Sequence, residues 1–304
     1  MLLEKVECLI EKVSSELSVQ VPDFFNNISV KEYINLLSDY PDLASYSFAS
    51  LDTVKFCQQI NESYGISALE SFHKLVLLSL IKKNIAKLPS LDLPEKVISN
   101  YYSNFSMIVN HIQDDSYCGC YLFENDKFKK DLAVCSLRLI PVGARKIHLS
   151  KLPRRFLISN GFFQFILGLY VVLFKLKGIG PLYEMHVDSG DPELISEFTE
   201  QGWKKTCQIM AEMLKKNKNV KGVFGGSWFY DPELEKVSPH LAFCRKVAVE
   251  NGALTFKLGQ NESAINNATK TSKTRRKLWR QGRYQPTNYQ LIWPRAEIIK
   301  FSEK

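Results

Sequence analysis

The spacing of apolar residues changes once along the 304-residue chain, and this change limits the folds that the chain can adopt. In the first third, apolar side chains recur at three- and four-residue steps, as in Val6, Leu9 and Val13, which is the spacing of one helix face. Beyond it, short runs of β-branched and aromatic residues are separated by turns and helical segments. We therefore predict a helical N-terminal region over residues 1–112 and an α/β domain over residues 113–304.

Composition indicates the general class of protein. Apolar residues make up 45% and charged residues 24% of the chain, as in ordinary globular domains. The seven cysteines are odd in number and scattered, which indicates a reduced, cytoplasmic protein. Cys118-Gly119-Cys120 lacks the two-residue gap and the second ligand pair of a zinc site, so we expect no metal. Met1–Lys5 runs directly into charged residues, and we expect no export signal.

Strands and helices alternate beyond residue 113. In chain order, the expected elements are a hairpin of residues 117–123 and 131–141, an apolar helix within residues 156–174, a strand of residues 182–188, a helix of residues 192–217, a strand of residues 220–227, a helix of residues 239–250 and a strand of residues 253–257. This order predicts the α/β (α+β) class, with a mixed central sheet.

The segment Phe156–Phe174 is nearly uncharged. Basic residues flank it on both sides: Lys151, Arg154, Arg155, Lys175 and Lys177. Its length approaches the ~20 residues of a membrane-spanning helix, but Ser159–Gly161 and Gln164 shorten the apolar core to about ten residues. A buried helix is the favoured interpretation, ahead of a helix that touches a membrane surface or binds an acyl chain, and ahead of a membrane span. We therefore expect a cytoplasmic protein, with peripheral membrane contact as an alternative.

Alternation along the strand Leu182–Asp188 separates its side chains into two kinds. Glu184, His186 and Asp188 share one face, and the other face is apolar. Glu184 and His186 lie roughly 7 Å apart on such a strand, so the carboxylate can tune the imidazole directly or through one water. An ionisable face requires a cleft, partners or solvent, so the strand lines a cleft or lies at a wet sheet edge. We favour the cleft, and Glu184 and His186 are candidate catalytic residues.

A second candidate segment, Gly225-Gly226-Ser227-Trp228, ends the next expected strand. The glycine pair leaves bare backbone that another group can approach closely. This segment forms either the wall of a ligand site, with donors from Trp228 and Tyr230, or a packed turn. A nucleophile elbow has the sequence Gly-x-Ser-x-Gly. It is excluded here because Phe229 stands where the motif needs its second glycine. A hydrolytic triad of Ser227, His186 and a carboxylate is a weaker alternative.

The net charge of +8 is concentrated near the C-terminus. Residues 263–296 contain no acidic residue but eight basic ones: Lys270, Lys273, Arg275, Arg276, Lys277, Arg280, Arg283 and Arg295. A local basic patch indicates an anionic partner: a cofactor phosphate, an acidic carrier protein or a membrane headgroup. Nucleic acid is the least favoured partner because no recognised nucleic-acid-binding motif accompanies the charge. A solvated helix is the alternative.

Two stretches together resemble a known superfamily. The first is Cys118–Phe123, a turn, and Val134-Cys135-Ser136-Leu137-Arg138-Leu139-Ile140-Pro141, and the second is Leu182-Tyr183-Glu184-Met185-His186-Val187-Asp188. In this order they resemble the GCN5-related N-acetyltransferase (GNAT)-like acyltransferases, particularly the acyl-homoserine-lactone synthase branch. His186 stands where that branch has an arginine, and the acidic turn Ser189–Glu193 stands where the superfamily has a glycine-rich pyrophosphate loop. The resemblance therefore does not extend to lactone synthesis.

The resemblance implies a GNAT-like mixed sheet in which an acyl thioester lies where two parallel strands splay apart, next to Gly225 and Gly226. It implies transfer of an acyl group from a coenzyme A (CoA) or carrier-protein thioester to an amine or hydroxyl acceptor, with no tightly bound cofactor. Glu184 or His186 would act as general base, and the backbone of Gly225 and Gly226 would polarise the thioester carbonyl.

The remaining candidate residues have binding and proton-transfer roles in this hypothesis. Tyr230 would protonate the leaving thiolate, Ser227 and Trp228 would line the site, and three arginines would hold the donor's phosphates. These arginines are Arg275, Arg276 and Arg280. The alternative function is a non-catalytic protein that binds an anionic partner or a membrane surface through its basic C-terminal helix.

Overall fold

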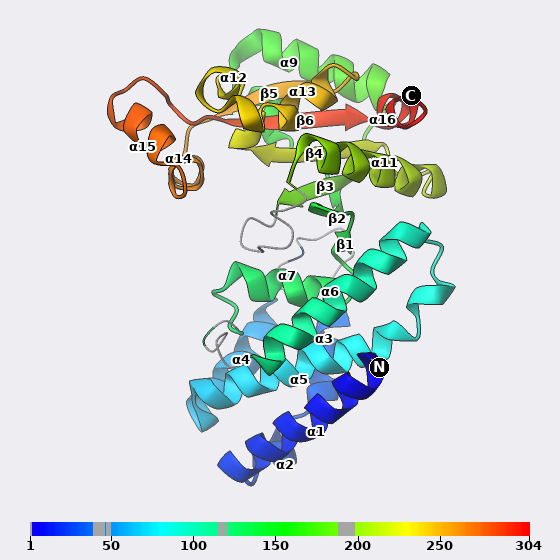
Figure 1. Ribbon diagram of the computed structural model, residues 1–304, viewed down its shortest axis with the longest axis vertical. Coiled ribbons are helices and arrows are strands. Elements are labelled where there is room, and N and C mark those ends of the chain that lie inside the picture. The colour runs from blue at the N-terminus through cyan, green and yellow to red at the C-terminus, as the bar shows by residue number, and fades with distance from the viewer. Residues whose placement is uncertain (1, 39–45, 47–49, 115–118, 120, 188–197) are drawn as a thin grey trace. The chain divides into compact units, whose positions relative to one another are not determined.

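The computed structural model describes residues 2–38, 46, 50–114, 119, 121–187 and 198–304. The chain divides into two compact units, Met1–Pro141 and Val142–Lys304, which contain the helices and the sheet shown in Figure 1. The division falls after Pro141, whereas the sequence placed the end of the helical region at residue 112. The α/β class with a mixed sheet and an N-terminal helical region is confirmed.

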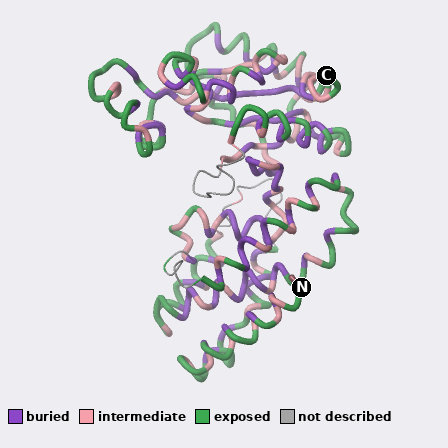
Figure 2. Tube along the Cα trace, viewed as in Figure 1, coloured by how far each residue is buried: buried purple, intermediate pink, exposed green. Residues whose placement is uncertain are grey.

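The described part of the first unit is helical except for a two-residue strand, β1 (Ile140–Pro141), at its end. Its helices are α1 (Leu2–Gln20), α2 (Phe24–Asn27), α3 (Val30–Ser38), α4 (Leu51–Tyr64), α5 (Ile66–Ile85), η1 (Leu88–Ser90), α6 (Glu95–Gln113) and α7 (Asp126–Cys135). Apolar residues occur on every side of α5, and most of its turns are buried, as Figure 2 shows. A helix that is apolar all round forms the centre of a bundle, and α5 contacts α1, α3, α4, α6 and α7.

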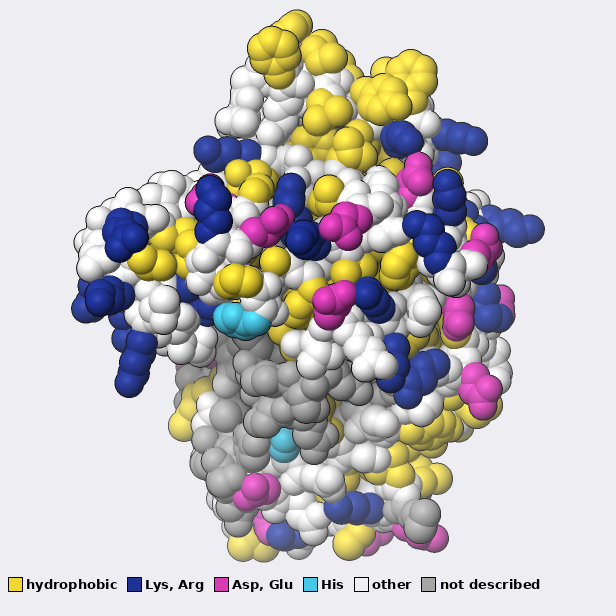
Figure 3. Space-filling model, turned by 45° about the horizontal axis from the view of Figure 1, so that its top comes forward, with side chains coloured by type: hydrophobic (Ala, Val, Ile, Leu, Met, Phe, Trp, Pro, Cys, Tyr) yellow, Lys and Arg dark blue, Asp and Glu magenta, His cyan; other side chains and the backbone are white. Residues whose placement is uncertain are grey.

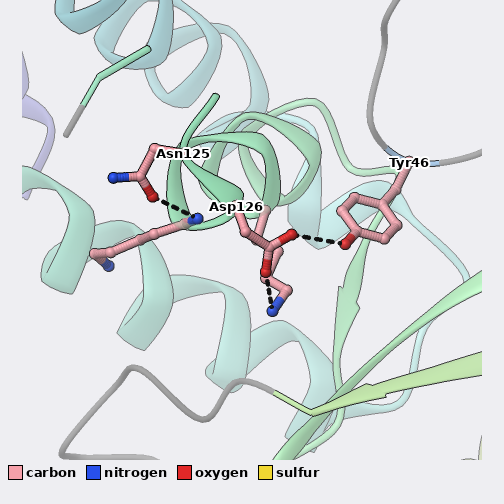
Figure 4. A network of polar contacts seen from close by, with 5 residues as sticks. Tyr46, Asn125 and Asp126 are labelled. Atoms are coloured by element: carbon pink, nitrogen blue, oxygen red, sulfur yellow. Dashed lines mark hydrogen bonds and ion pairs between the residues drawn. The ribbon is translucent and has the colours of Figure 1, made fainter. Parts of the chain in front are cut away.

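The predicted hairpin of residues 117–123 and 131–141 is wrong in its second half, because Asp126–Cys135 forms α7. The Asn125 side chain accepts a hydrogen bond from the Lys127 backbone N–H and caps this helix, and Asp126 forms an ion pair with Lys130 one turn later. Tyr46 also donates to Asp126, as Figure 4 shows. The local apolar residues follow a helical rather than an alternating spacing. In the first half, residues 117, 118 and 120 lie outside the described residues, and residues 121–123 form bends and a turn and no strand.

A buried histidine lies at the core of the first unit. The Nδ1 atom of His73 is 2.6 Å from the Tyr121 carbonyl oxygen, and its Nε2 atom is 3.4 Å from the Cys57 sulfur. Burial lowers the pKa of His73 to about 4, so this imidazole is neutral at physiological pH. His73 is therefore a structural residue of the core.

The second unit contains a twisted sheet with the strand order β2-β3-β4-β6-β5. The strands are β2 (Arg145–Lys151), β3 (Pro181–Val187), β4 (Gly222–Ser227), β5 (Leu254–Gly259) and β6 (Asn288–Pro294). Only β3 and β4 are paired in parallel among these described strands, and β2–β3, β4–β6 and β5–β6 are antiparallel. The predicted strands β3, β4 and β5 are confirmed, but β2 and β6 were not predicted. Asp188, the last residue of the predicted strand, lies outside the described residues.

Helices cover both faces of this sheet. On one face, which we call the α9 face, α8 (Arg155–Ile158), α9 (Gly161–Tyr170) and the π-helical turn η3 (Val171–Lys175) pack over Leu182, Phe224 and Ile292. On the other, the α11 face, lie α11 (Glu200–Lys216), α13 (Phe243–Val249) and α16 (Arg295–Ser302), whose residues contact the odd-numbered side chains of β2 and β6. The remaining helical elements are η4 (Trp228–Tyr230), α12 (Leu234–Val237), η5 (Pro239–Leu241), α14 (Glu262–Thr269) and α15 (Lys273–Arg280).

The favoured interpretation of residues 156–174, a buried helix, is wrong for α9. Only Gln164 and Gly168 of this helix are buried, and most of its apolar side chains are exposed. Among the described helices, none combines the length and the apolar character needed to cross a membrane.

Candidate functional site

Three ionisable side chains meet on the α9 face, where β2 pairs with β3. His148 of β2 lies opposite Glu184 of β3, and His186 lies one step further along β3 on the same face. The His148 Nδ1 atom is 2.8 Å from the His186 Nε2 atom, and the His148 Nε2 atom is 3.7 Å from a Glu184 carboxylate oxygen. The residues therefore form a chain from carboxylate to imidazole to imidazole.

The surroundings of these three side chains favour proton transfer between them. His148 is buried, while Glu184 and His186 are half-buried. Burial raises the pKa of the Glu184 carboxyl, and a hydrogen bond from Ser150 partly opposes this effect. A carboxylate behind two hydrogen-bonded imidazoles can stabilise a proton taken up at the outer one.

The predicted pair of Glu184 and His186 thus lies on one face, as alternation required. His148 was missed because its strand, β2, was not predicted. The signal was present: Lys146, His148 and Ser150 alternate with Ile147 and Leu149. The two basic residues at the start of β2 obscured it, although both are buried.

β3 and β4 are adjacent and parallel, but their pairing is short. Residue pairs occur at Tyr183–Val223 and Glu184–Phe224, although β3 runs on to Val187 and β4 to Ser227. The two strands are therefore unpaired towards their carboxyl ends, although Met185 still lies against Gly225. We call these unpaired ends, residues 185–187 and 225–227, the β3–β4 gap.

Gly226 borders the β3–β4 gap on the α9 face. It is exposed although it lies on an internal strand, and a Cβ atom added there would meet no atom closer than 3.8 Å. Bare backbone next to open space can approach a bound group closely. The predicted backbone site thus has open access at Gly226.

Gln290 of β6 lies opposite Gly226 on the same face. Its side chain is only 3% exposed, and its Nε2 atom has no hydrogen-bond partner among the described residues. A buried amide donor without a partner is costly, and such groups often belong to ligand sites. Gln290 was missed because β6 is buried on both faces and follows a basic segment, so it carries no alternating pattern.

Tyr230 lies on the opposite side of the sheet from Glu184 and His186. Its hydroxyl oxygen is 3.1 Å from the position of a Cβ atom on Gly225, beside Met185, which points to the α11 face. The side chain is 1% exposed, and burial raises its pKa, with the nearby Arg145 opposing that effect. Tyr230 therefore adjoins the β3–β4 gap from the α11 face, whereas His148 and His186 lie on the α9 face.

Ser227 and Trp228 belong to a packed turn. The Ser227 hydroxyl accepts a hydrogen bond from the Phe229 backbone N–H. Trp228 stacks on Phe229, with ring centroids 4.2 Å apart, and packs with Leu234 and Tyr284. Of the two interpretations of this segment, the structure therefore supports the packed turn for Trp228.

Two of the three predicted phosphate-binding arginines bind the protein itself. Arg275 is 5% exposed, donates to the Ala268 carbonyl and the Ser238 hydroxyl, and lies over the Trp228 ring. Arg276 donates to the carbonyl oxygens of Thr269 and Lys270. Both close the corner between α14 and α15. Arg280 is exposed, together with most of the basic segment.

A cavity of about 760 Å³ lies at the start of α11. It is lined by Phe198 and Thr199 before that helix and by Phe243 and Val247 of α13. Three glutamates also line it, Glu200, Glu235 and Glu250, so its charge is unsuited to a phosphate.

His148, Glu184 and His186 are also a potential metal-ligand set. One ligand atom from each lies within 4.8 Å of the others, and two imidazoles with one carboxylate suit zinc or iron. The sequence predicted no metal, since His148 was not recognised. The hydrogen bond between the two imidazoles uses one nitrogen of each ring, so coordination through those two atoms and the proton-transfer chain exclude one another.

No protein-family model matches the chain, and no curated protein matches its sequence. Among solved structures, the chain is similar to an acyltransferase in complex with decanoyl-CoA, at 10% identity and a TM-score of 0.46, over 87% of this chain and 86% of that one. It is also similar to an acyltransferase mutant in complex with octanoyl-CoA, at 11% identity and a TM-score of 0.42, over 87% of each chain.

Proposed function

We propose that the second unit is an acyltransferase that moves an acyl group from a CoA or carrier-protein thioester to an amine or hydroxyl acceptor. The observation that carries this proposal is the position of the Glu184–His148–His186 chain beside the β3–β4 gap. The resemblance described above implies a donor thioester between two splayed parallel strands. The early end of the β3–β4 pairing supports that expectation.

His186 is the general base in this mechanism. Its Nε2 atom is hydrogen-bonded to His148, so its Nδ1 atom takes the proton of the attacking amine or hydroxyl. His148 and Glu184 stabilise the imidazolium that forms, as a carboxylate does behind a catalytic histidine. His148 and Glu184 are thus positioning residues, which refines the earlier choice between Glu184 and His186.

The attacking atom forms a bond to the thioester carbonyl carbon, and the carbon–sulfur bond breaks when the tetrahedral intermediate collapses. The Gln290 amide and backbone at Gly226 are the proposed donors to the developing oxyanion. Tyr230, next to Gly225 on the other side of the β3–β4 gap, is the proposed proton donor to the leaving thiolate.

Thiol release from acyl-CoA in the presence of amine and alcohol acceptors tests this proposal. His186→Ala should lower kcat/KM by about 10²- to 10⁴-fold, the usual contribution of a general base. His240→Ala is the matched control, because His240 is an exposed histidine of η5 that is not one of the three proposed site residues. Equal turnover by wild type and His186→Ala would remove the proposal.

The alternative function, binding of an anionic partner through the C-terminal helix, has less support. Arg275 and Arg276 donate to carbonyl oxygens within the same corner, so only the exposed residues of α15 are available to a partner. Binding through them requires neither Glu184 nor His186.

A further inference from the structure

The outer side of α8, α9, η3 and the turn that follows them is an apolar ridge. We call it the α9 ridge, and its exposed residues are Ile158, Phe162, Phe163, Phe165, Ile166, Leu167, Tyr170, Leu173, Phe174 and Ile179. Phe163 is 89% exposed and Phe162 is 72% exposed. Figure 3 shows these side chains gathered on a projecting part of the molecule. A contiguous apolar surface of this kind marks an interaction site in a water-soluble fold.

Two inward contacts fix which side of α9 faces outward. The Gln164 amide donates to the Lys257 carbonyl at 3.0 Å and accepts from the Lys257 N–H at 2.9 Å, so it pairs with the backbone of the edge strand β5. Gly168 lies against Leu157, where an added Cβ atom would clash. The helix is therefore held by a polar residue and a glycine, and its large apolar side chains point away from the protein.

Basic side chains border the α9 ridge. Lys151, Arg154, Arg155 and Lys177 are exposed, and none has an acidic partner within the part of the chain that the structure describes. Lys175 is paired with Glu297 at 3.0 Å. The sequence holds no aspartate or glutamate between Asp131 and Glu184. An apolar ridge with a purely basic border complements a surface that is apolar beneath and anionic at its rim.

We propose that the α9 ridge inserts into the surface of a bilayer that contains anionic lipids. Residues 161–175 are about 22 Å long as a helix, and such a helix lies in the membrane plane with its apolar side in the headgroup–acyl boundary. The basic border then contacts the lipid phosphates. A projecting ridge can insert into a deformable lipid surface, whereas a rigid protein partner would need a hollow of matching shape. The inference is independent of acyl transfer.

Flotation of the full chain with vesicles tests the proposal. Vesicles of phosphatidylcholine with roughly 30% phosphatidylglycerol should bind the protein at least about tenfold more tightly than vesicles of phosphatidylcholine alone. Each basic residue near the surface adds electrostatic attraction to the anionic lipid. Phe162→Ser with Phe163→Ser should lower binding at least about tenfold through lost apolar burial. Val19→Ser, an equally exposed apolar residue in α1, is the control and should bind as wild type does.

The basic border requires a charge-matched control. Arg154→Ala with Arg155→Ala should weaken binding to anionic vesicles, whereas Lys273→Ala with Lys277→Ala removes the same charge from α15 and should have a smaller effect. In a Phe163→Trp variant, tryptophan emission should shift to shorter wavelength on addition of anionic vesicles.

Three results would overturn the proposal. The first is the absence of binding by the wild type to anionic vesicles. The second is binding that the two phenylalanine substitutions leave unchanged. The third is a wild-type dimer in solution that Phe162→Ser and Phe163→Ser convert to a monomer, because the α9 ridge would then be covered by a second copy of the chain.

Discussion

The Nδ1 atom of His148 and the Nε2 atom of His186 lie 2.8 Å apart, across two antiparallel strands. Behind them, Glu184 approaches the second nitrogen of His148 at 3.7 Å. In the proposed function, His186 takes up the proton, and His148 and the half-buried Glu184 stabilise the charge that forms.

Because Glu184, His148 and His186 lie in a row, substitutions at the two histidines should have non-additive effects on kcat. His148→Asn should lower kcat by roughly 10- to 100-fold with little change in KM, because His148 acts through His186. In the double variant with His186→Ala, the loss should be no larger than in His186→Ala alone. Steady-state kinetics of the four proteins measure this coupling. Fully additive losses would show that His148 acts separately.

The raised pKa of Glu184 predicts how stability depends on pH. Burial raises the pKa of Glu184 in the folded chain above its ordinary value of 4.5. Below pH 4.5 the carboxyl is protonated in both the folded and the unfolded chain, and its burial has no charge penalty. As the pH rises through the folded pKa, the buried group ionises and the folded chain loses stability. Glu184→Gln should therefore be more stable than wild type at neutral pH, and the difference should vanish in acid. Urea denaturation at both pH values checks this.

Glu212→Gln, at an exposed position of α11, removes the same charge and is the control for that comparison. A variant at Glu184 that is less stable at neutral pH would instead indicate that the ion pair with His148 outweighs the cost of burial.

Gln290 should contribute to turnover without contributing to stability. Gln290→Leu removes a buried amide nitrogen without a partner among the described residues, so its free energy of unfolding should stay equal or rise by about 1 kcal/mol. Its kcat should fall by roughly 10²-fold if the amide stabilises the oxyanion. Gln285→Leu, at an exposed position, should change neither quantity. Loss of stability with unchanged kcat would assign Gln290 to the core alone.

His73 predicts acid sensitivity of the first unit. Its pKa is lowered from 6.5 to about 4 by burial, so its contribution to stability is complete above 6.5 and is lost as the pH falls towards 4. The full effect amounts to about 3 kcal/mol at one pKa unit per 1.36 kcal/mol. Thermal unfolding between neutral pH and pH 4 should show this loss, and His73→Gln should reduce the slope. An equal slope in both proteins would contradict it.

Proton transfer and metal binding at the same three residues predict opposite responses to chelation. If His148 and His186 share a proton, a strong chelator should leave turnover unchanged, and added zinc should inhibit by occupying their nitrogens. Turnover assays after chelation, followed by zinc addition, measure this. Loss of activity that zinc restores would replace the proposed general base with a metal centre.

The strands that the sequence predicted correctly share a physical property with each other. β3 and β4 carry an alternating or continuous apolar pattern that ends in polar residues or glycine, and this pattern placed Glu184 and His186 on one face. β2 begins with two basic residues, Arg145 and Lys146, which in the sequence are typical of a surface segment, although both are buried. In the fold, the Trp203 ring lies against the Arg145 guanidinium. His148 therefore escaped prediction with its strand.

The orientation of α9 depends on contacts distant in sequence. Its apolar composition suggested burial, but Gln164 pairs with Lys257, which is 93 residues away, and this pairing turns the apolar side outward. The role of Arg275 was equally inaccessible, because a run of basic residues does not reveal which one donates to Ser238 inside the fold. Periodicity finds elements, whereas such contacts decide what each face meets.

Hydrogen exchange with a non-hydrolysable acyl-CoA analogue tests whether a donor thioester lies in the β3–β4 gap. Exchange should slow in peptides that contain Glu184–Val187 and Gly225–Ser227, with no change in α15. Protection confined to α15, or to the cavity at the start of α11, would contradict it.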